Sequence, residues 1–166
     1  MAKYYTHTIG FSNIHKKPSK KSEVVSQMIF GDTFSISKKI NQWLKIKTKE
    51  DNYIGYIKNQ NYIKYSKPTH KVNILRAIVY KFPNKDRKIY ELPFNSKIKV
   101  LERKKKFFKF SKGWINKNQL KPINYKEKNI FNKIKIFKNI KYVWGGKSYK
   151  GIDCSALVQI CFNFNN

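Results

Sequence analysis

The sequence predicts a mainly β protein with an α+β C-terminal part: two small β-barrels in tandem, then a glycine-rich loop that enters a helix. Short segments of alternating apolar and polar residues fill the first two thirds of the chain. These segments recur in the same order further along, which indicates a repeated unit. Helical spacing and clustered glycines are confined to the last part of the sequence.

Residues 1–66 are predicted to form the first barrel. Pro18 and the Gly31–Asp32 pair mark turns between short strands. The alternating segments are 33–37, 43–47 and 53–57. The residues from Ser66 to His70 read as a linker, because they are polar and contain a proline.

Residues 67–122 are predicted to form a second barrel on the same plan. Pro83 follows Pro18 by 65 residues, and the later segments keep this order. The corresponding pairs of segments are 95–100 with 31–36, 107–110 with 43–46, and 113–118 with 55–60. The last pair of segments is separated by fewer residues than the other pairs, so we expect the second copy to have a shorter final hairpin.

Residues 123–166 contain the helical patterns. Apolar residues at 130, 131, 134 and 137 predict a helix over 126–137. After the glycines, Cys154, Leu157, Val158 and Cys161 fall on one face of a second helix. A thiol in the first turn of a helix lies where a negative charge is favoured, so Cys154 is a candidate nucleophile. The competing interpretation is a buried, inert cysteine.

The run Tyr142-x-Trp-Gly-Gly, followed by Gly-Ile-Asp-Cys154-Ser-x-Leu-Val-Gln, resembles the nucleophile segment of the NlpC-type cell-wall peptidases. These are papain-like cysteine hydrolases. The pattern Gly-Asp, then Trp-Leu, then Gly-Tyr-Ile in the first barrel resembles bacterial SH3-like domains, and the second copy is degenerate because Asn95 replaces the turn glycine. The resemblance implies two SH3-like barrels followed by the N-terminal half of a papain-like domain, truncated before the catalytic histidine.

The resemblance implies roles for five residues. Cys154 would be the nucleophile, and the Tyr142 hydroxyl would face the reacting carbonyl. Asp153 would either cap the helix or bind the free amine of the substrate, and Ser155 would cap the helix or donate to the substrate. Tyr56, on the first barrel, would approach the N-terminal end of the substrate. The acids nearest to it, Glu50 and Asp51, receive no role.

No general base can be assigned from the sequence. The three histidines, His7, His15 and His70, all precede Cys154, and none matches the family's histidine motif. We therefore expect the 166-residue chain to be inactive or nearly so. We also expect the helix that follows Cys154 to leave Leu157, Val158 and Ile160 partly bare.

The implied reaction is cysteine-dependent hydrolysis of the γ-D-glutamyl to diamino-acid bond in short muropeptides with a free N-terminal L-alanine. No metal or cofactor is implied. The alternative is a non-catalytic binding module for cell-wall fragments or acidic polymers, including nucleic acid.

The formal net charge is +28, yet only three of the 37 basic residues are arginines. Proteins that read bases rely on arginine, so we expect no specific nucleic-acid partner and only salt-dependent binding of polyanions. The sequence begins without the apolar core of a signal peptide and has no apolar run of membrane length, so we expect a cytoplasmic protein with no membrane partner. Two cysteines seven residues apart on a helix are expected to stay free. The oligomeric state is left open.

Overall fold

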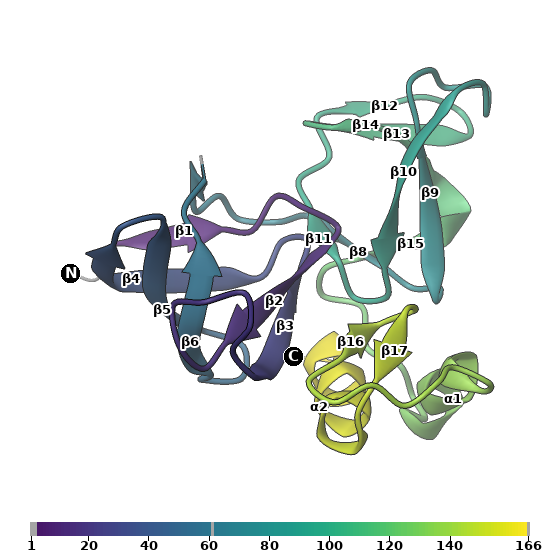
Figure 1. Cartoon of the computed structure of the whole chain (residues 1–166). Coiled ribbons are helices and arrows are strands. Elements are labelled where there is room, and N and C mark those ends of the chain that lie inside the picture. The colour runs from purple at the N-terminus through teal and green to yellow at the C-terminus, as the bar shows by residue number, and fades with distance from the viewer. Residues whose placement is uncertain (1–2, 61, 166) are drawn as a thin grey trace.

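The computed structural model describes residues 3–60 and 62–165. Residues 1–2 and 61 of the predicted first barrel, and residue 166 of the predicted C-terminal domain, lie outside the described residues. The chain is mainly β with few helices, as predicted. Figure 1 shows three parts: an N-terminal unit of strands β1–β7, a central unit of strands β8–β15, and a C-terminal segment that holds the two α-helices.

The N-terminal unit is one seven-stranded sheet wrapped around an apolar core. Its strands are β1 (Tyr4–Thr6), β2 (Phe11–His15), β3 (Val24–Ile29), β4 (Thr33–Ile40), β5 (Trp43–Thr48), β6 (Ile54–Lys58) and β7 (Ile63–Lys64). They pair in the order β3-β2-β6-β5-β4-β1-β7. The three alternating segments of the sequence fall on β4, β5 and β6. Their inward side chains, including Phe34, Ile46 and Ile57, form the core because every second residue of a strand faces the same side.

The central unit divides its strands between two sheets. Its strands are β8 (His70–Val72), β9 (Arg76–Tyr80), β10 (Lys88–Pro93), β11 (Lys97–Ile98), β12 (Glu102–Arg103), β13 (Phe107–Phe110), β14 (Gly113–Asn116) and β15 (Leu120–Pro122), with a 3₁₀ turn η1 (Lys117–Gln119). The sheets run β10-β9-β14-β13-β12 and β11-β8-β15. The two units therefore differ in sheet organisation, and the division into a first SH3-like barrel over 1–66 and a degenerate second one over 67–122 stays a prediction. Phe30 of the N-terminal unit enters the core of the central unit and contacts Phe110 edge to face.

The C-terminal segment contains α1 (Phe131–Ile134), a 3₁₀ turn η2 (Lys135–Phe137), the short hairpin β16 (Lys147–Ser148) and β17 (Gly151–Ile152), and α2 (Cys154–Phe164). The helix predicted over 126–137 is thus reduced to two short turns. Its first turn has no acidic residue and its N-cap, Ile130, has no side chain that can accept a hydrogen bond. Asn129 Oδ1 accepts a hydrogen bond from the Phe131 N–H at 3.0 Å, so the helix begins only after this residue. A helix this short is not stable on its own and depends on packing against its neighbours.

Helix α2 takes its packing surface from both preceding units. Phe164 stacks on Phe94 of the central unit with ring centroids 4.7 Å apart, and Ile29 of the N-terminal unit belongs to the same cluster. Ile160 is completely buried in this cluster, so the expectation that it is partly bare is wrong. Val158 is exposed, as expected. The upstream units supply the cover that the sequence did not reveal.

Lys71 of β8 fixes the C-terminal end of α2. Its Nζ donates to the carbonyl oxygens of Tyr125, at 2.7 Å, and of Phe164, and it lies 4.4 Å from the centre of the Phe164 ring. Burial, together with the charges of Lys97 and Lys126, lowers the pKa of Lys71 to about 8. A cation at this position complements the negative end of the helix.

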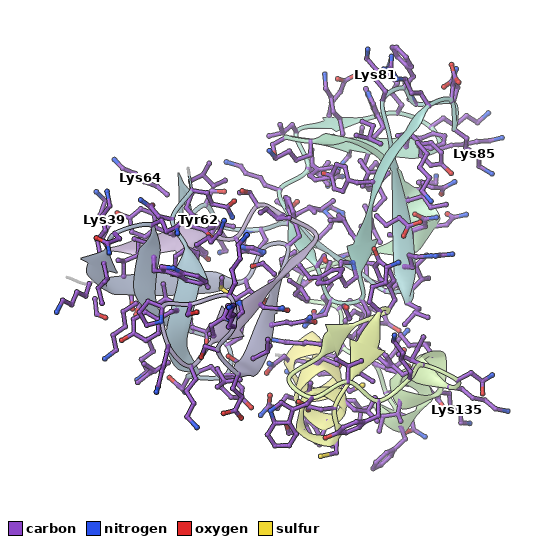
Figure 2. All side chains as sticks on the ribbon, viewed as in Figure 1. Lys39, Tyr62, Lys64, Lys81, Lys85 and Lys135 are labelled. Atoms are coloured by element: carbon purple, nitrogen blue, oxygen red, sulfur yellow. The ribbon has the colours of Figure 1, made fainter. Side chains whose placement is uncertain are left out.

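Most other lysines project outward from all three parts, as Lys39, Lys64, Lys81 and Lys135 do in Figure 2. No helix among the described residues is long and apolar enough to cross a bilayer.

Because His7 is buried, we expect the folded protein to lose stability in acid. Its side chain is completely buried with Nε2 3.3 Å from Ser12 Oγ, and burial lowers its pKa from 6.5 to about 4 against the opposing field of Asp32. Between these values the unfolded chain binds a proton that the folded chain does not. Stability is therefore lost as pH falls from 6.5 toward 4, by up to about 3 kcal/mol for this group.

Urea unfolding at pH 7 and pH 4.5 measures this loss in the wild-type chain and in His7→Gln. We expect the variant to lose distinctly less stability between the two pH values. An equal loss in both proteins would show that His7 is not the group responsible.

Candidate functional site

Cys154 is the first residue of α2 and its side chain is exposed. Asp153 is the N-cap: its Oδ1 accepts hydrogen bonds from the Ala156 N–H at 2.7 Å and from Ser155 Oγ at 2.8 Å. Its Oδ2 accepts from the Gly145 N–H at 3.0 Å. One carboxylate therefore starts the helix and ties the glycine-rich loop to it, so the exposed thiol sits on a fixed turn.

The glycine-rich loop packs too closely for a Cβ at all three of its glycines, Gly145, Gly146 and Gly151. Gly145 has φ +70° and lies against β3, where an added Cβ would come 2.7 Å from the carbonyl oxygen of Val24. At Gly151 an added Cβ would come 2.2 Å from Val143 Cγ2. Glycine permits both the backbone conformation and the close approach, which explains the clustered glycines.

Lys147, in the middle of this loop, is buried in the N-terminal unit. Its Nζ lies 2.9 Å from Asp51 Oδ2 and 3.4 Å from Asp32 Oδ2, and all three side chains are almost inaccessible to solvent. Its backbone N–H donates to Gln27 Oε1 at 2.8 Å. Burial disfavours the ammonium charge, but the two carboxylates outweigh this effect and raise the pKa of Lys147.

Glu50 extends this cluster to the central unit. Its carboxylate accepts from the Thr33 N–H at 3.0 Å and from Lys97 Nζ of β11 at 3.0 Å. Burial and the neighbouring Asp32 raise the pKa of Glu50, and Lys97 opposes this. We call Asp32, Glu50 and Asp51 the buried acidic cluster. The pairing of this cluster with Lys147 could not be predicted from the sequence, because a lysine in a lysine-rich chain is expected at the surface.

Cys154 borders an open, largely apolar depression of about 470 Å³. The lining residues are Ile134, Lys135, Phe137, Lys138, Ile140, Tyr142, Ile152, Asp153, Cys154 and Leu157. The structure thus brings three of the predicted site residues, Tyr142, Asp153 and Cys154, to one surface. Tyr142 is 62% exposed there, and its backbone pairs with Ile152 just before Asp153.

The other two predicted residues are placed differently. Ser155 is exposed, and its hydroxyl donates to Asp153. Tyr56 lies half-buried on β6, paired with His15 of β2 and Lys45 of β5, and it does not line the depression. Trp144, in the same glycine-rich loop, is 64% exposed.

None of the three histidines lines the depression beside Cys154. His7 is buried next to Ser12, His15 Nδ1 lies 3.1 Å from the Ser22 carbonyl oxygen, and His70 Nδ1 lies 2.9 Å from Thr69 Oγ1. Each has a structural environment of its own. Within residues 3–60 and 62–165, therefore, no imidazole is positioned to accept the Cys154 proton.

The two thiols differ sharply in environment, and both are free, as expected. Cys161 faces the cluster under α2 and is 1% exposed. Burial raises the pKa of its thiol to about 11. Only Cys154 of the two is placed for chemistry with a molecule from solution.

Two family models match parts of this chain. Residues 139–166 match the NlpC/P60 family, and residues 14–61 match a domain described as the bacterial dipeptidyl-peptidase SH3 domain. The first match contains the whole glycine-rich loop and Cys154. The second covers most of the N-terminal unit.

A curated relative and a solved structure agree with these matches. The gamma-D-glutamyl-L-lysine dipeptidyl-peptidase of Bacillus subtilis strain 168 is 22% identical over 159 residues, which cover 86% of this chain and 53% of the relative. The chain thus spans about half the length of that relative. An NlpC/P60 family protein from Bacillus cereus ATCC 10987 has the same fold, with a TM-score of 0.81 at 16% identity, covering 98% of this chain and 72% of the other. The resemblance to NlpC-type peptidases with an SH3-like domain is confirmed.

We expect substitution of Lys147 to cause a large loss of stability. Lys147→Met should lower the free energy of unfolding by about 3–5 kcal/mol, because it leaves Asp32 and Asp51 buried without a counter-charge. Lys150→Met, on the exposed turn of the same hairpin, is the matched control and should change stability by less than about 0.5 kcal/mol. Urea unfolding of both variants measures the difference. Equal, small effects would show that the buried ion pairs do not hold the loop.

Proposed function

We propose that this chain carries the nucleophile and part of the substrate site of a cysteine hydrolase that cleaves the γ-D-glutamyl to diamino-acid bond of short muropeptides. The observation that carries the proposal is the exposed Cys154 thiol on a capped helix, beside Asp153 and Tyr142 at one depression. The resemblance to NlpC/P60 proteins supports the cysteine chemistry. The name of the Bacillus subtilis relative supports the bond class.

In the proposed reaction, Cys154 Sγ attacks the carbonyl carbon of the γ-glutamyl amide and forms a tetrahedral intermediate. The Tyr142 hydroxyl donates to the developing oxyanion. The intermediate collapses to a thioester as the amine of the diamino acid leaves with a proton, and water then hydrolyses the thioester. A base must take the thiol proton and return it to the leaving amine.

We infer that the 166-residue chain alone turns over slowly at most. A general base must lie within about 3 Å of the proton that it takes. His7, His15 and His70 lie away from the depression, and each has its own hydrogen-bond partner. What the chain retains is a placed thiol and groups that can orient a substrate.

Asp153 is the proposed partner of the substrate's free amine. Its two oxygens already accept three hydrogen bonds, and a carboxylate has about four lone-pair sites, so one remains for an ammonium group. An ammonium group bound there would also offset the free-energy cost of holding the negative charge of Asp153 beside the largely apolar depression. This role requires an unblocked L-alanine, and it leaves Ser155 to orient the Asp153 carboxylate.

Protection of Cys154 against alkylation tests binding without requiring turnover. We expect iodoacetamide to modify Cys154 at least ten-fold faster than Cys161, read by mass spectrometry, because Cys161 is buried and its pKa is raised to about 11. The tripeptide L-Ala-γ-D-Glu-L-Lys should slow the modification of Cys154. The same peptide with an acetylated amine should not.

Asp153→Asn is the matched variant, because asparagine caps a helix as well as aspartate does but carries no charge. We expect the variant to fold and to lose protection by the tripeptide, with stability lowered by about 1–3 kcal/mol because its amide NH2 cannot accept from the Gly145 N–H as Asp153 Oδ2 does. Equal protection by the acetylated peptide would contradict the amine-binding role. Tripeptide turnover that disappears in Cys154→Ala would contradict the inference that the chain alone is nearly inactive.

A further inference from the structure

Basic residues gather at the far end of the central unit, where two hairpin loops meet. One loop joins β9 to β10 and the other joins β12 to β13. Figure 2 shows Lys81 and Lys85 at this end, away from the C-terminal segment. Eight basic residues lie on or next to these loops: Lys81, Lys85, Arg87, Lys88, Arg103, Lys104, Lys105 and Lys106. Two acids, Asp86 and Glu102, lie on or next to the loops, and Glu91 of β10 pairs with Lys88.

The two loops enclose a groove of about 420 Å³, which we call the hairpin groove. Lys85 with Pro83 and Asn84 forms one side, and residues 104–106 with Phe107 form the other. Four lysines thus border one concave surface. Lys104, Lys105 and Lys106 are exposed, as is Lys85, so a ligand in solution can reach all four side chains.

These lysines are poorly neutralised by the protein itself. Glu102 lies 4.0 Å from Lys104 and 3.7 Å from Lys109, which divides its charge between them. Among the described residues, Lys85, Lys105 and Lys106 have no carboxylate within 4.0 Å. The buried acidic cluster, by contrast, gives its lysines carboxylates at 2.9 to 3.4 Å. Repulsion between like charges around one groove is relieved most directly by a bound anion.

The backbone of the first loop holds its basic residues in place at a cost. Lys85 has φ 66° and Arg87 has φ 49°, both in the left-handed region that glycine and asparagine adopt more easily. The neighbouring Asn84 Oδ1 accepts a hydrogen bond from the Asp86 N–H at 3.1 Å, which fixes the turn. The loop therefore presents its cations from a defined conformation.

We propose that the hairpin groove binds a linear phosphate polymer through the charges of its backbone, at a site separate from Cys154. Phosphates in a chain are closely spaced, and several can face the four lysines at once. Lysine is suited to this contact because it acts as a point charge and needs no particular orientation of the phosphate. This proposal is independent of the proposed hydrolase function.

The aromatic residues at this end favour a polymer without bases. Phe82 is 43% exposed, but Phe107 and Trp114 are buried, with Lys104 Nζ 5.0 Å and Lys109 Nζ 5.5 Å from the Trp114 ring. Successive bases of a single strand need a row of exposed rings on which to stack. The concave shape likewise suits a narrow chain better than the broad surface of a bilayer.

The test is binding of the full chain to fluorescently labelled linear inorganic polyphosphate, measured by anisotropy over a range of NaCl concentrations. The variant replaces Lys104, Lys105 and Lys106 with glutamine. The matched control replaces Lys38, Lys39 and Lys47, exposed lysines of the N-terminal unit, so that both proteins lose three positive charges. We expect at least a ten-fold loss of affinity in the variant and less than two-fold in the control.

The salt dependence gives a second readout. If three phosphates are no longer neutralised, the slope of log K against log salt should become shallower by about 2, since each contact contributes roughly 0.7. The single variant Lys105→Gln should lose affinity for polyphosphate by about two- to three-fold. It keeps the proposal testable if the triple variant folds poorly. Poly(glycerol phosphate) should compete with the label if a wall polymer is the source of the phosphates, whereas competition by polyphosphate alone indicates the inorganic polymer.

Three outcomes would overturn the proposal. Equal losses in the variant and the control would show binding by net charge alone. Tighter binding of a dT oligonucleotide than of polyphosphate, at equal phosphate concentration, would indicate a nucleic-acid surface. Retention on vesicles with anionic lipid, without binding of polyphosphate, would indicate a membrane surface.

Discussion

The arrangement of the three parts depends on the buried acidic cluster. The chain has nine acidic residues against 37 basic ones, and three of the nine are concentrated in this cluster. Lys147 of the C-terminal segment pairs with Asp32 and Asp51, and Lys97 of the central unit pairs with Glu50. Apolar contacts supply most of the stability but are non-directional, whereas a buried charge needs a partner at a defined position. We infer that the cluster sets how the parts fit together.

The buried acidic cluster is connected to the candidate nucleophile by a short series of contacts. Lys147 is held by Gln27 and by the buried acidic cluster, and it fixes the hairpin of β16 and β17 against the N-terminal unit. Asp153 then joins Gly145 of the same loop to the first turn of α2, where Cys154 begins. The Cys154 thiol is therefore positioned through acids that lie more than a hundred residues earlier in the chain.

Local features of the sequence predicted much of the fold and of the site. Alternation gave the strands of the N-terminal unit, and the glycines with Asp153 gave a capped helix that starts at Cys154. Contacts between distant residues could not be predicted in this way. Asp51 and Lys147 are 96 residues apart, and neither lies in a motif that indicates the other. For the same reason the burial of Ile160 was missed, because its cover comes from Phe94 and Ile29 on other units.

The shared packing of α2 also has a consequence for the order in which the protein forms. A ribosome releases the N-terminal and central units before this helix, so Ile29, Phe94 and Lys71 can already be in place when it emerges. The helix then packs on units that have already folded instead of forming a core of its own. Its thiol reaches a defined position only in molecules whose upstream units have folded correctly, so misfolded chains carry a cysteine but no site.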